Sequence, residues 1–543
     1  MHELHLADYT VFFFYFIIVS GYGIYIYQRR KAKQVNSKDF FLAEGSLTWW
    51  AIGASLIASN ISAEHFIGMS GSGFALGLAI STYEWMAAAT LIIVAVFFLP
   101  VYLKNKIYTM PQFLEKRYNS TVATIMAIFW LLVYVFVNLT SILYLGAVAI
   151  TAISGINFAV CIIGLALFSI VVTLGGMKVI GYTDVIQVAV LIIGGLVTTY
   201  LALNQVSANF GFGEDFIMGA KLMHEKADSH FHMIFNSSHQ YYPELPGLSV
   251  LIGGMWINNL NYWGCNQYII QRALGADLKT ARNGILFAAF LKLLVPVIAV
   301  LPGIAAYVLY QEGLFQNEML DDTGVLKPDK AYATLMNLLP PGLKGMAFAA
   351  LTAAIVASLA GKANSIATIF SLDIYRKHFR QQATERQLVL TGRWTVMISM
   401  IIASAVAPAL ANLEQAYQFI QEYVGFISPG VLIIFLLGFF WKRATSAAAL
   451  TAALLTIPLS TLLKYLPYWT AGAFPDFPFL DRMTIVFVSL MALMVVMSLL
   501  DKGSKSQPAV IQVDTRMFKT SPAFMVGSVL IMGILTALYT VFW

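Results

Sequence analysis

Long apolar runs recur along the whole chain and alternate with short polar segments. Each run has about 20 residues, which as a helix is enough to cross the roughly 30 Å hydrocarbon core of a bilayer. The pattern therefore predicts an all-α polytopic membrane protein. We predict 14 transmembrane helices, at residues 9–28, 47–76, 80–103, 122–152, 157–174, 180–203, 248–270, 284–311, 346–374, 389–409, 413–438, 446–466, 481–499 and 522–543.

Basic residues are distributed unevenly between the two sets of loops. Cytoplasmic loops of membrane proteins carry an excess of lysine and arginine. Here 23 of the 33 lysines and arginines fall in one set of loops, at 29–46, 104–121, 175–179, 271–283, 375–388, 440–445 and 500–520. We expect these loops to be cytoplasmic and both termini to lie outside a cytoplasmic (inner) membrane. The net charge of +6 follows from this bias, so no nucleic-acid partner is needed to explain it.

Composition narrows the function classes. Hydrophobic residues make up 59% of the 543 residues and charged residues only 11%, which leaves no room for a separate soluble domain and makes the lipid bilayer the expected environment. The sequence has no His-Glu-x-x-His motif, no metal-ligand spacing of cysteine and histidine, and no glycine-rich phosphate loop after a strand. We therefore predict that the protein is not an enzyme. A channel would instead require rings of like residues.

Polar residues interrupt two of the apolar runs. The second run contains Ala-Ser-Asn-Ile-Ser-Ala-Glu-His (58–65), and the seventh contains Trp-Ile-Asn-Asn-Leu-Asn-Tyr-Trp-Gly (256–264). Irregular backbone at the membrane midplane is tolerated where it lines a cavity, and paired interruptions in two repeats indicate a transporter binding site. The two interruptions are five spans apart, as they would be if spans 2–6 and 7–11 were the halves of an inverted repeat.

Several ionisable side chains fall inside the predicted spans. They are costly in a membrane and are therefore functional candidates: Glu64, His65, Glu84, Asp184, Lys292, Lys362 and Glu422. Glu84 and Lys292 either pair to hold two helices together or converge on a hydroxyl-rich ligand. Nearby aromatic rings either cover the apolar face of a sugar or belong to ordinary packing: Tyr83, Trp85, Tyr262, Trp263 and Tyr417.

Four longer motifs carry a family resemblance. They are Ser-Leu-Ile-Ala-Ser-Asn-Ile-Ser-Ala-Glu-His-Phe-Ile-Gly-Met-Ser-Gly (55–71), Tyr-Thr-Asp-Val-Ile-Gln (182–187), Tyr-Trp-Gly-Cys-Asn-Gln-Tyr-Ile-Ile-Gln-Arg (262–272) and Phe-Ile-Gln-Glu-Tyr-Val-Gly-Phe-Ile-Ser-Pro-Gly (419–430). Over essentially its whole length the chain resembles the sodium/solute symporter family, and its sugar-carrying members in particular. The resemblance implies a LeuT-like core of two inverted five-helix repeats that works by alternating access. It also implies sodium-coupled uptake of a galactose-like or glucose-like monosaccharide, and we expect a functional monomer.

The resemblance and the spans together predict five segments. They are an extra transmembrane helix with a cytoplasmic loop (1–46), the first inverted repeat (47–203), an extracellular loop (204–247), the second inverted repeat with its own extracellular loop at 312–345 (248–438), and three C-terminal transmembrane helices (439–543).

The resemblance also assigns the sugar site. It implies Glu84, Asn259, Lys292 and Gln421 as hydrogen-bonding groups, with Tyr262 stacked on the sugar as the inner gate, and an outer gate of Met69, Tyr83 and Tyr417. His65 stands where the galactose-carrying members have a glutamine, Ala87 replaces a serine, and Tyr417 replaces a phenylalanine. Imidazole titrates near neutral pH, so a uronic acid or another polyol is an alternative to a neutral hexose. The alternative is that His65 only packs against and bonds a neighbouring helix.

The resemblance places sodium at the break of the second span. The implied ligands are the carbonyls of Ala58, Ile61 and Ala354 and the hydroxyl of Ser358, with Asp184 beside the site. Such hard oxygens suit a small cation. Ala357 replaces a second serine, and Lys362 lies one turn after Ser358 on the same helix face. Lys362 is therefore a coupling candidate: it replaces sodium with a tethered charge, carries a proton, pairs with Asp184, or reaches toward the cytoplasmic end.

Overall fold

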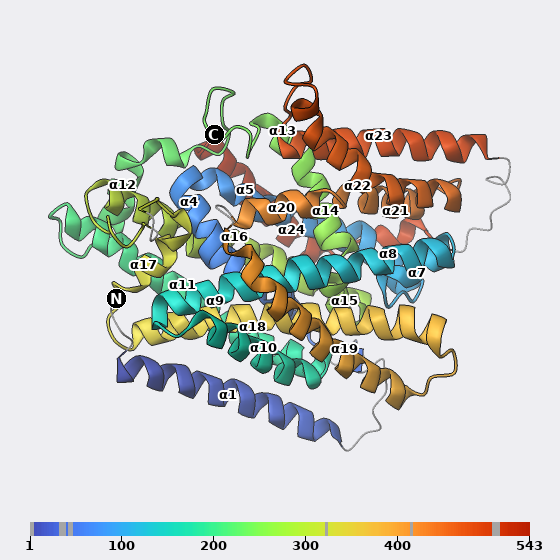
Figure 1. Ribbon diagram of the computed structural model, residues 1–543, viewed down its shortest axis with the longest axis horizontal. Coiled ribbons are helices and arrows are strands. Elements are labelled where there is room, and N and C mark those ends of the chain that lie inside the picture. The colour runs from blue at the N-terminus through green and yellow to red at the C-terminus, as the bar shows by residue number, and fades with distance from the viewer. Residues whose placement is uncertain (1–4, 32–39, 42–46, 321–323, 413–415, 502–510) are drawn as a thin grey trace.

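The computed structural model describes residues 5–31, 40–41, 47–320, 324–412, 416–501 and 511–543, and Figure 1 shows these as a bundle of long helices. Among these residues the only β-structure is one isolated bridge between Leu320 and Leu326. The helices of the bundle are α1 (Leu6–Lys31), α3 (Trp49–Asn60), α4 (Ser70–Leu76), α5 (Thr82–Ile93), α6 (Leu99–Lys104), α7 (Met110–Arg117), α8 (Ser120–Leu132), α9 (Thr140–Ser154), α10 (Phe158–Leu174), α11 (Met177–Asn209), α13 (Leu248–Ile252), α14 (Gly254–Cys265), α15 (Gln267–Leu274), α16 (Leu278–Gln311), α18 (Leu343–Ile369), α19 (Glu385–Val406), α20 (Ala416–Gly425), α21 (Ser428–Phe440), α22 (Ser446–Trp469), α23 (Phe479–Leu500) and α24 (Pro522–Val541).

Eleven helices in the described part of the chain are long and apolar enough to cross a membrane. The all-helical membrane architecture is therefore confirmed, whereas the number 14 stays a prediction. Three of the predicted spans do not correspond to one continuous helix of sufficient length, and the structure shows why in each case. The helix at Phe158–Leu174 is a short one of 17 residues, and the runs at 47–76 and 248–270 are broken within the bundle.

Both breaks fall where the polar interruptions occur, but one position differs from the prediction. The first break separates α3 from the π-helical turn η1 (Glu64–Met69), with Ile61 in an extended conformation. The second lies at Asn266, also extended, between α14 and α15. The predicted interruption at 256–264 was therefore wrong in detail, because these residues are helical. The break falls just beyond them, where the hydroxyl of Tyr134 donates to Asn266 and accepts from the amide of Gln267.

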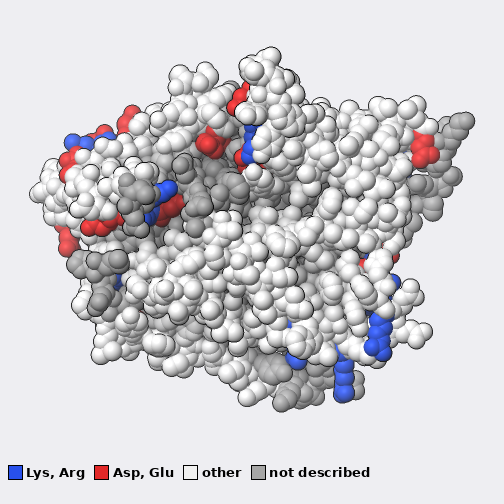
Figure 2. All heavy atoms as spheres, viewed as in Figure 1, with Lys and Arg blue, Asp and Glu red and all other residues white. Residues whose placement is uncertain are grey.

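The most buried helices form the centre of the bundle. In α18, 89% of the residues in the most apolar window are buried, against 17% in α24 and 11% in α1, so the last two are peripheral. α18 packs against α11, and α16 packs against α3 and α4. In Figure 2 much of the middle of the visible face carries no charge, and most charged residues lie toward the two ends, apart from a small group near the top. This is the surface expected of a protein embedded in a bilayer.

Asp8 joins the peripheral helix α1 to the centre. Its Oδ1 accepts hydrogen bonds from the amides of Gly342 and Gly345, both at 2.8 Å, at the beginning of α18. Asp8 is 1% exposed, and a Cβ at Gly345 would overlap the Asp8 backbone. A carboxylate at a helix N-terminus satisfies amides that lack intrahelical partners and interacts favourably with the helix dipole.

We expect Asp8→Ala to lower the free energy of unfolding by about 1–2 kcal/mol, the usual cost of losing an N-terminal cap. Asp8→Asn retains an acceptor oxygen and should lose clearly less. The measurement is thermal unfolding of the purified variants in detergent, with solute uptake as the control for function. If the alanine and asparagine variants unfolded at the same temperature as the wild type, this cap would have no role in docking α1.

Candidate functional site

The first break exposes backbone groups inside the bundle. The amide of Ser62, which would continue the α3 ladder to the carbonyl of Ala58, instead donates to Nδ1 of His65 at 3.4 Å. Among the described hydrogen bonds Ala58 thereby loses its helical donor. The carbonyl of Ser59 accepts a hydrogen bond from Ser358 Oγ at 2.9 Å. The break therefore directs carbonyl oxygens from α3 toward α18.

A buried charged cluster lies beside this break. Lys292 of α16 donates hydrogen bonds to Oε2 of Glu84 on α5 and to Oδ1 of Asn60, the last residue of α3. Lys292 is completely buried and the two acceptors nearly so. His65 places Nε2 at 3.4 Å from the other carboxylate oxygen of Glu84. Three helices thus converge on one ion pair, which satisfies the lysine inside the membrane.

Aromatic rings and amides complete the wall. The hydroxyl of Tyr262 accepts a hydrogen bond from Nδ2 of Asn60 at 2.9 Å, and Lys292 Nζ lies 4.9 Å from the ring centroid of Trp263. The amide Nδ2 of Asn259 is buried and has no hydrogen-bond partner among the described residues. Buried polar groups normally have partners, so this donor is available for a ligand.

The cavity that these groups surround contains most of the predicted sugar site. It is about 50 Å³ in volume and is lined by His65, Glu84, Asn259, Tyr262 and Gln421 together with Asn60, Glu64, Tyr83, Asn258, Trp263 and Ile420. Lys292 lies directly behind Glu84. The structure therefore brings all six predicted sugar-contacting residues together. The free space suffices for a few water molecules, so a larger solute requires the lining to open.

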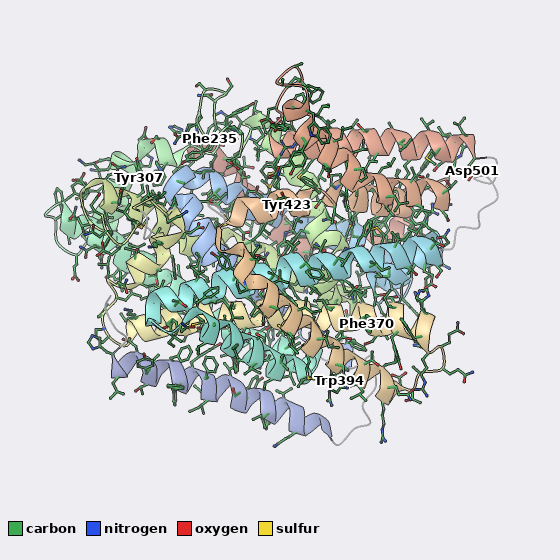
Figure 3. The ribbon with its side chains drawn as sticks, in the orientation of Figure 1. Phe235, Tyr307, Phe370, Trp394, Tyr423 and Asp501 are labelled. Carbon is green, nitrogen blue, oxygen red and sulfur yellow. The ribbon has the colours of Figure 1, made fainter. Side chains whose placement is uncertain are left out.

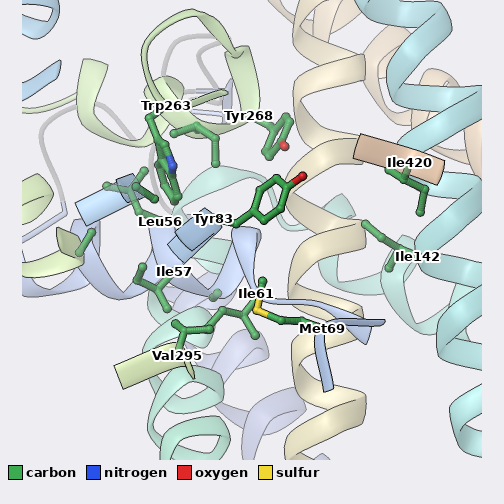
Figure 4. Packing of buried hydrophobic residues seen from close by; sticks show 14 of the residues in the cluster. Leu56, Ile57, Ile61, Met69, Tyr83, Ile142, Trp263, Tyr268, Val295 and Ile420 are labelled. Atoms are coloured by element: carbon green, nitrogen blue, oxygen red, sulfur yellow. The ribbon is translucent and has the colours of Figure 1, made fainter. Parts of the chain in front are cut away.

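The predicted gating residues are placed as follows. Tyr83 lines the cavity and is nearly buried, and Met69 is fully buried at the end of η1. Figure 4 shows both among the apolar side chains that pack around the break. Tyr417 belongs to α20, and its side chain lies outside the described residues. The gating roles stay predictions.

A second small cavity lies on the other side of Tyr262. It has a volume of about 60 Å³ and shares Glu64, Tyr262, Ile420 and Gln421 with the first. Its further lining includes Tyr268 and Lys362. Because Tyr262 and Gln421 line both cavities, a change in either side chain would alter the connection between them.

Lys362 lies close to the predicted sodium position. Its Nζ donates to Ser358 Oγ at 2.9 Å and lies 4.9 Å from the ring centroid of Tyr268. Ser358 in turn donates to the break carbonyl of Ser59. The predicted ligands Ala58, Ile61, Ala354 and Ser358 are all buried. These oxygens are of the type that a sodium ion binds, but an ammonium group already contacts one of them.

Asp184 does not pair with Lys362, which was one of the sequence-based alternatives. Its carboxylate accepts a hydrogen bond from Ser55 and lies 3.7 Å from a guanidinium nitrogen of Arg272. Arg272 also donates to Ser55 Oγ at 2.7 Å. Arg272 falls within the cytoplasmic loop predicted at 271–283, whereas it is 1% exposed on α15. Gly361 permits this arrangement, because a Cβ there would overlap the guanidinium.

Sequence reasoning missed two site residues, Asn60 and Arg272. Asn60 bridges Lys292 and Tyr262. The sequence could have indicated this role, because Asn60 is a polar residue at the end of an apolar run. Arg272 is the last residue of the motif at 262–272. A residue at the end of a predicted span is easily assigned to the adjacent loop, and Arg272 was missed for this reason. Its buried partner lies on another helix and is invisible in the local pattern.

These features define the class: a polytopic membrane protein with broken helices that place buried polar and charged groups around a cavity between them. The pattern of the sodium:solute symporter family matches residues 40–456. The chain belongs to this family, and the membership makes it a sodium-coupled solute symporter. Its members are transporters.

Individual relatives agree with this assignment. The chain is 46% identical to a sodium/glucose cotransporter of Vibrio parahaemolyticus over 100% of this chain and 99% of the relative. It is 32% identical to a sodium/myo-inositol cotransporter 2 of Homo sapiens over 82% of this chain and 68% of the relative. Among solved structures, a Na+-coupled sialic acid symporter in a substrate-bound outward-open state is similar with a TM-score of 0.76 and 22% identity, covering 92% of this chain and 98% of that chain. This last similarity concerns the fold.

Proposed function

We propose that the protein carries a neutral monosaccharide of the galactose or glucose type into the cell together with sodium, by alternating access. The observation that carries the proposal is the convergence of Lys292, Glu84, His65 and the unpartnered amide of Asn259 around one cavity bordered by Tyr262 and Trp263. Such a wall offers both donors and acceptors in fixed directions and aromatic faces for the apolar side of a sugar ring.

Charge favours a neutral substrate over a uronic acid. The positive charge of Lys292 is matched by Glu84, and Glu64 adds a second carboxylate to the cavity wall. An anionic sugar would meet this extra negative charge in a region of low dielectric, where like charges repel strongly. Relatives named as carriers of glucose and of myo-inositol, both uncharged polyols, support the same choice.

For sodium we propose the oxygen donors at the break of α3, with Ser358 of α18. The proposal is supported by the carbonyl of Ala58, which lacks its helical donor among the described hydrogen bonds, and by the hydroxyl of Ser358 beside the break. Lys362 contacts Ser358, so a sodium ion at this position competes with the ammonium group or displaces it. Transport driven by protons, or independent of sodium with Lys362 as the built-in cation, is the alternative.

We further propose the topology predicted from the basic loops: a cytoplasmic membrane, both termini outside, the two inverted repeats at 47–203 and 248–438, and transport by a single chain. The two helix breaks lie five predicted spans apart, one in each proposed repeat, which supports this division. Paired broken helices of this kind are the usual substrate and ion site of transporters with inverted repeats.

The deciding experiment is uptake of labelled hexoses and hexuronates by purified protein in liposomes, under an inward sodium gradient, an inward proton gradient, or neither. Accumulation of a hexose only with sodium supports the proposal. Preference for a hexuronate would refute the neutral-sugar assignment, and equal uptake without sodium would make Lys362 the built-in cation.

Asn259→Ala should separate binding from stability. Because Nδ2 of Asn259 has no partner among the described residues, its removal costs little in folding but deletes a donor to the sugar, which should weaken solute binding by about tenfold or more. The matched control on the same helix is Asn261→Ala. Asn261 lines the second cavity and not the first, and it donates to Ser428 Oγ at 2.9 Å, so this variant should lose stability and retain affinity for a sugar bound in the first cavity. Equilibrium binding and thermal unfolding of both variants check the expectation, and unchanged binding in Asn259→Ala would contradict it.

A further inference from the structure

A membrane-facing groove lies away from the transport site. It is enclosed by α1, α10 and α11, with Arg393 of α19 at its edge, and its volume of about 360 Å³ is within the range of ligand pockets. Figure 1 shows α1, α10 and α19 together on one side of the bundle. The groove exists partly because its wall contains small residues, Ser20 and Gly23 on α1 and Gly175 before α11.

The wall of this groove is mainly apolar and is suited to a hydrocarbon chain. Of the residues that line it, all but Arg393, Ser20 and Thr183 are apolar or glycine. Ile24 is 56% exposed and Val171 is 68% exposed. Because these side chains face outward from a membrane-spanning part of the bundle, the surrounding medium is lipid, and an acyl chain can enter the groove from the side.

Arg393 supplies a positive charge that no acidic side chain of the described residues neutralises. No carboxylate of the described residues forms an ion pair with it, and its Nε is buried without a hydrogen-bond partner in that part of the chain. The guanidinium lies 5.9 Å from the ring centroid of Phe40. A guanidinium group binds phosphate through two parallel hydrogen bonds, and its pairing inside a membrane otherwise requires a carboxylate or carbonyl.

Aromatic residues mark the depth of Arg393. Its neighbour Trp394 is 57% exposed and lies in the half of α19 that begins at Glu385, on the same side of the bundle as α1 (Figure 3). Tyr22 and Tyr25 stack at 6.5 Å near the corresponding end of α1. Exposed tryptophan and tyrosine side chains lie at the level of lipid headgroups. Arg393 is eight residues, or about 12 Å, from the beginning of α19, and a long arginine side chain can extend from such a position toward a headgroup phosphate.

We propose that this groove binds one anionic phospholipid, with its phosphate on Arg393 and an acyl chain between α1, α10 and α11. Basic pockets between transmembrane helices on the cytoplasmic side are typical sites for such lipids. Because α1 contacts α18 and α11, the lipid stabilises the attachment of this peripheral helix to the central helices.

The test uses the full-length protein in detergent with defined lipids. We measure thermal unfolding against added phosphatidylglycerol, phosphatidylcholine with identical acyl chains, and soluble glycerol phosphate, and we count bound lipid by native mass spectrometry. Phosphatidylglycerol should bind at one site per chain and raise the unfolding temperature more than phosphatidylcholine. Glycerol phosphate should have no effect, since it lacks the acyl chain.

Variants separate the headgroup from the groove. Arg393→Gln should weaken phosphatidylglycerol binding by about tenfold, the effect of one charge-assisted hydrogen-bonded contact. Arg393→Lys should restore part of it, and Gly23→Leu, which fills the groove, should abolish retention of the lipid. Arg380→Gln, at an exposed arginine before α19, is the matched control and should bind as the wild type does.

The proposal is overturned if the two phospholipids bind equally well, if Arg393→Gln and Arg380→Gln behave alike, or if glycerol phosphate reproduces the shift. Should Arg393→Gln fail to fold, Gly23→Leu decides the question, because it leaves every charge in place. Undiminished lipid retention in that variant would exclude the groove as the site.

Discussion

Replacing Lys292 with methionine should abolish sugar transport and lower the free energy of unfolding by about 3–5 kcal/mol, the usual cost of removing one partner of a buried ion pair. Methionine has nearly the length of lysine and adds no polar group, so it leaves little cavity. The loss arises because Glu84 and Asn60 Oδ1 both accept hydrogen bonds from Lys292. Without the ammonium, the Glu84 carboxylate is left buried in the described part of the chain with Nε2 of His65, at 3.4 Å, as its remaining polar neighbour.

A second substitution distinguishes a structural pair from a sugar-binding one. Glu84→Gln added to Lys292→Met removes the unpaired charge, so the double variant should recover most of the lost stability. If the pair serves mainly to bind sugar, transport should stay undetectable in the double variant, because both a donor and an acceptor for the sugar are missing.

The two readouts are thermal unfolding in detergent and equilibrium sugar binding to the purified protein. Uptake into liposomes gives the transport rate. Recovery of both stability and transport in the double variant would show that Glu84 and Lys292 only hold α5 and α16 together. Wild-type affinity in Lys292→Met alone would refute the assignment of the site.

The sequence was sufficient for the class of fold because membrane helices depend on local composition. Lipid imposes one rule, that each crossing helix is long and apolar, and that rule can be read from a single segment. The position of the break at Asn266 was missed for the opposite reason. Asn266 ends α14 because Tyr134, on the distant turn η4 (Val133–Leu139), supplies hydrogen bonds to the free groups.

The candidate site was predictable to the extent that its residues stand out as polar within apolar runs. His65, Glu84 and Lys292 do so, and the structure brings them together. Pairing was less predictable: the sequence suggested Lys362 as the partner of Asp184, whereas the observed pairing with Arg272 depends on how α11, α15 and α18 pack. No local pattern contains that information.

Lys362→Met should change the ion dependence of transport and leave sugar recognition unaltered. The ammonium group donates to Ser358 Oγ at 2.9 Å, next to the break carbonyls proposed to bind sodium. Two unit charges about 6 Å apart repel by about 3 kcal/mol at an effective dielectric constant of 20. Removing the charge should therefore lower the sodium concentration for half-maximal uptake by at least tenfold.

Lys344→Met is the matched control, because it removes the same charge from the same helix. Lys344 donates to Asn337 Oδ1 at 3.0 Å near the beginning of α18. It lies 14 residues before Ser358, which corresponds to about 21 Å along a helix. At that distance its charge should have little influence on sodium, so this variant should keep the wild-type sodium dependence while losing some stability.

The direction in which Lys362→Met shifts the sodium dependence of uptake decides whether the lysine competes with sodium or replaces it. A competitor of sodium, when removed, makes uptake saturate at lower sodium. A built-in cation, when removed, makes uptake that needed no sodium either stop or become dependent on it. A loss of discrimination among sugars, with unchanged sodium dependence, would contradict both roles. It would instead give Lys362 a role in sugar recognition through the second cavity, which it lines together with Tyr262 and Glu64.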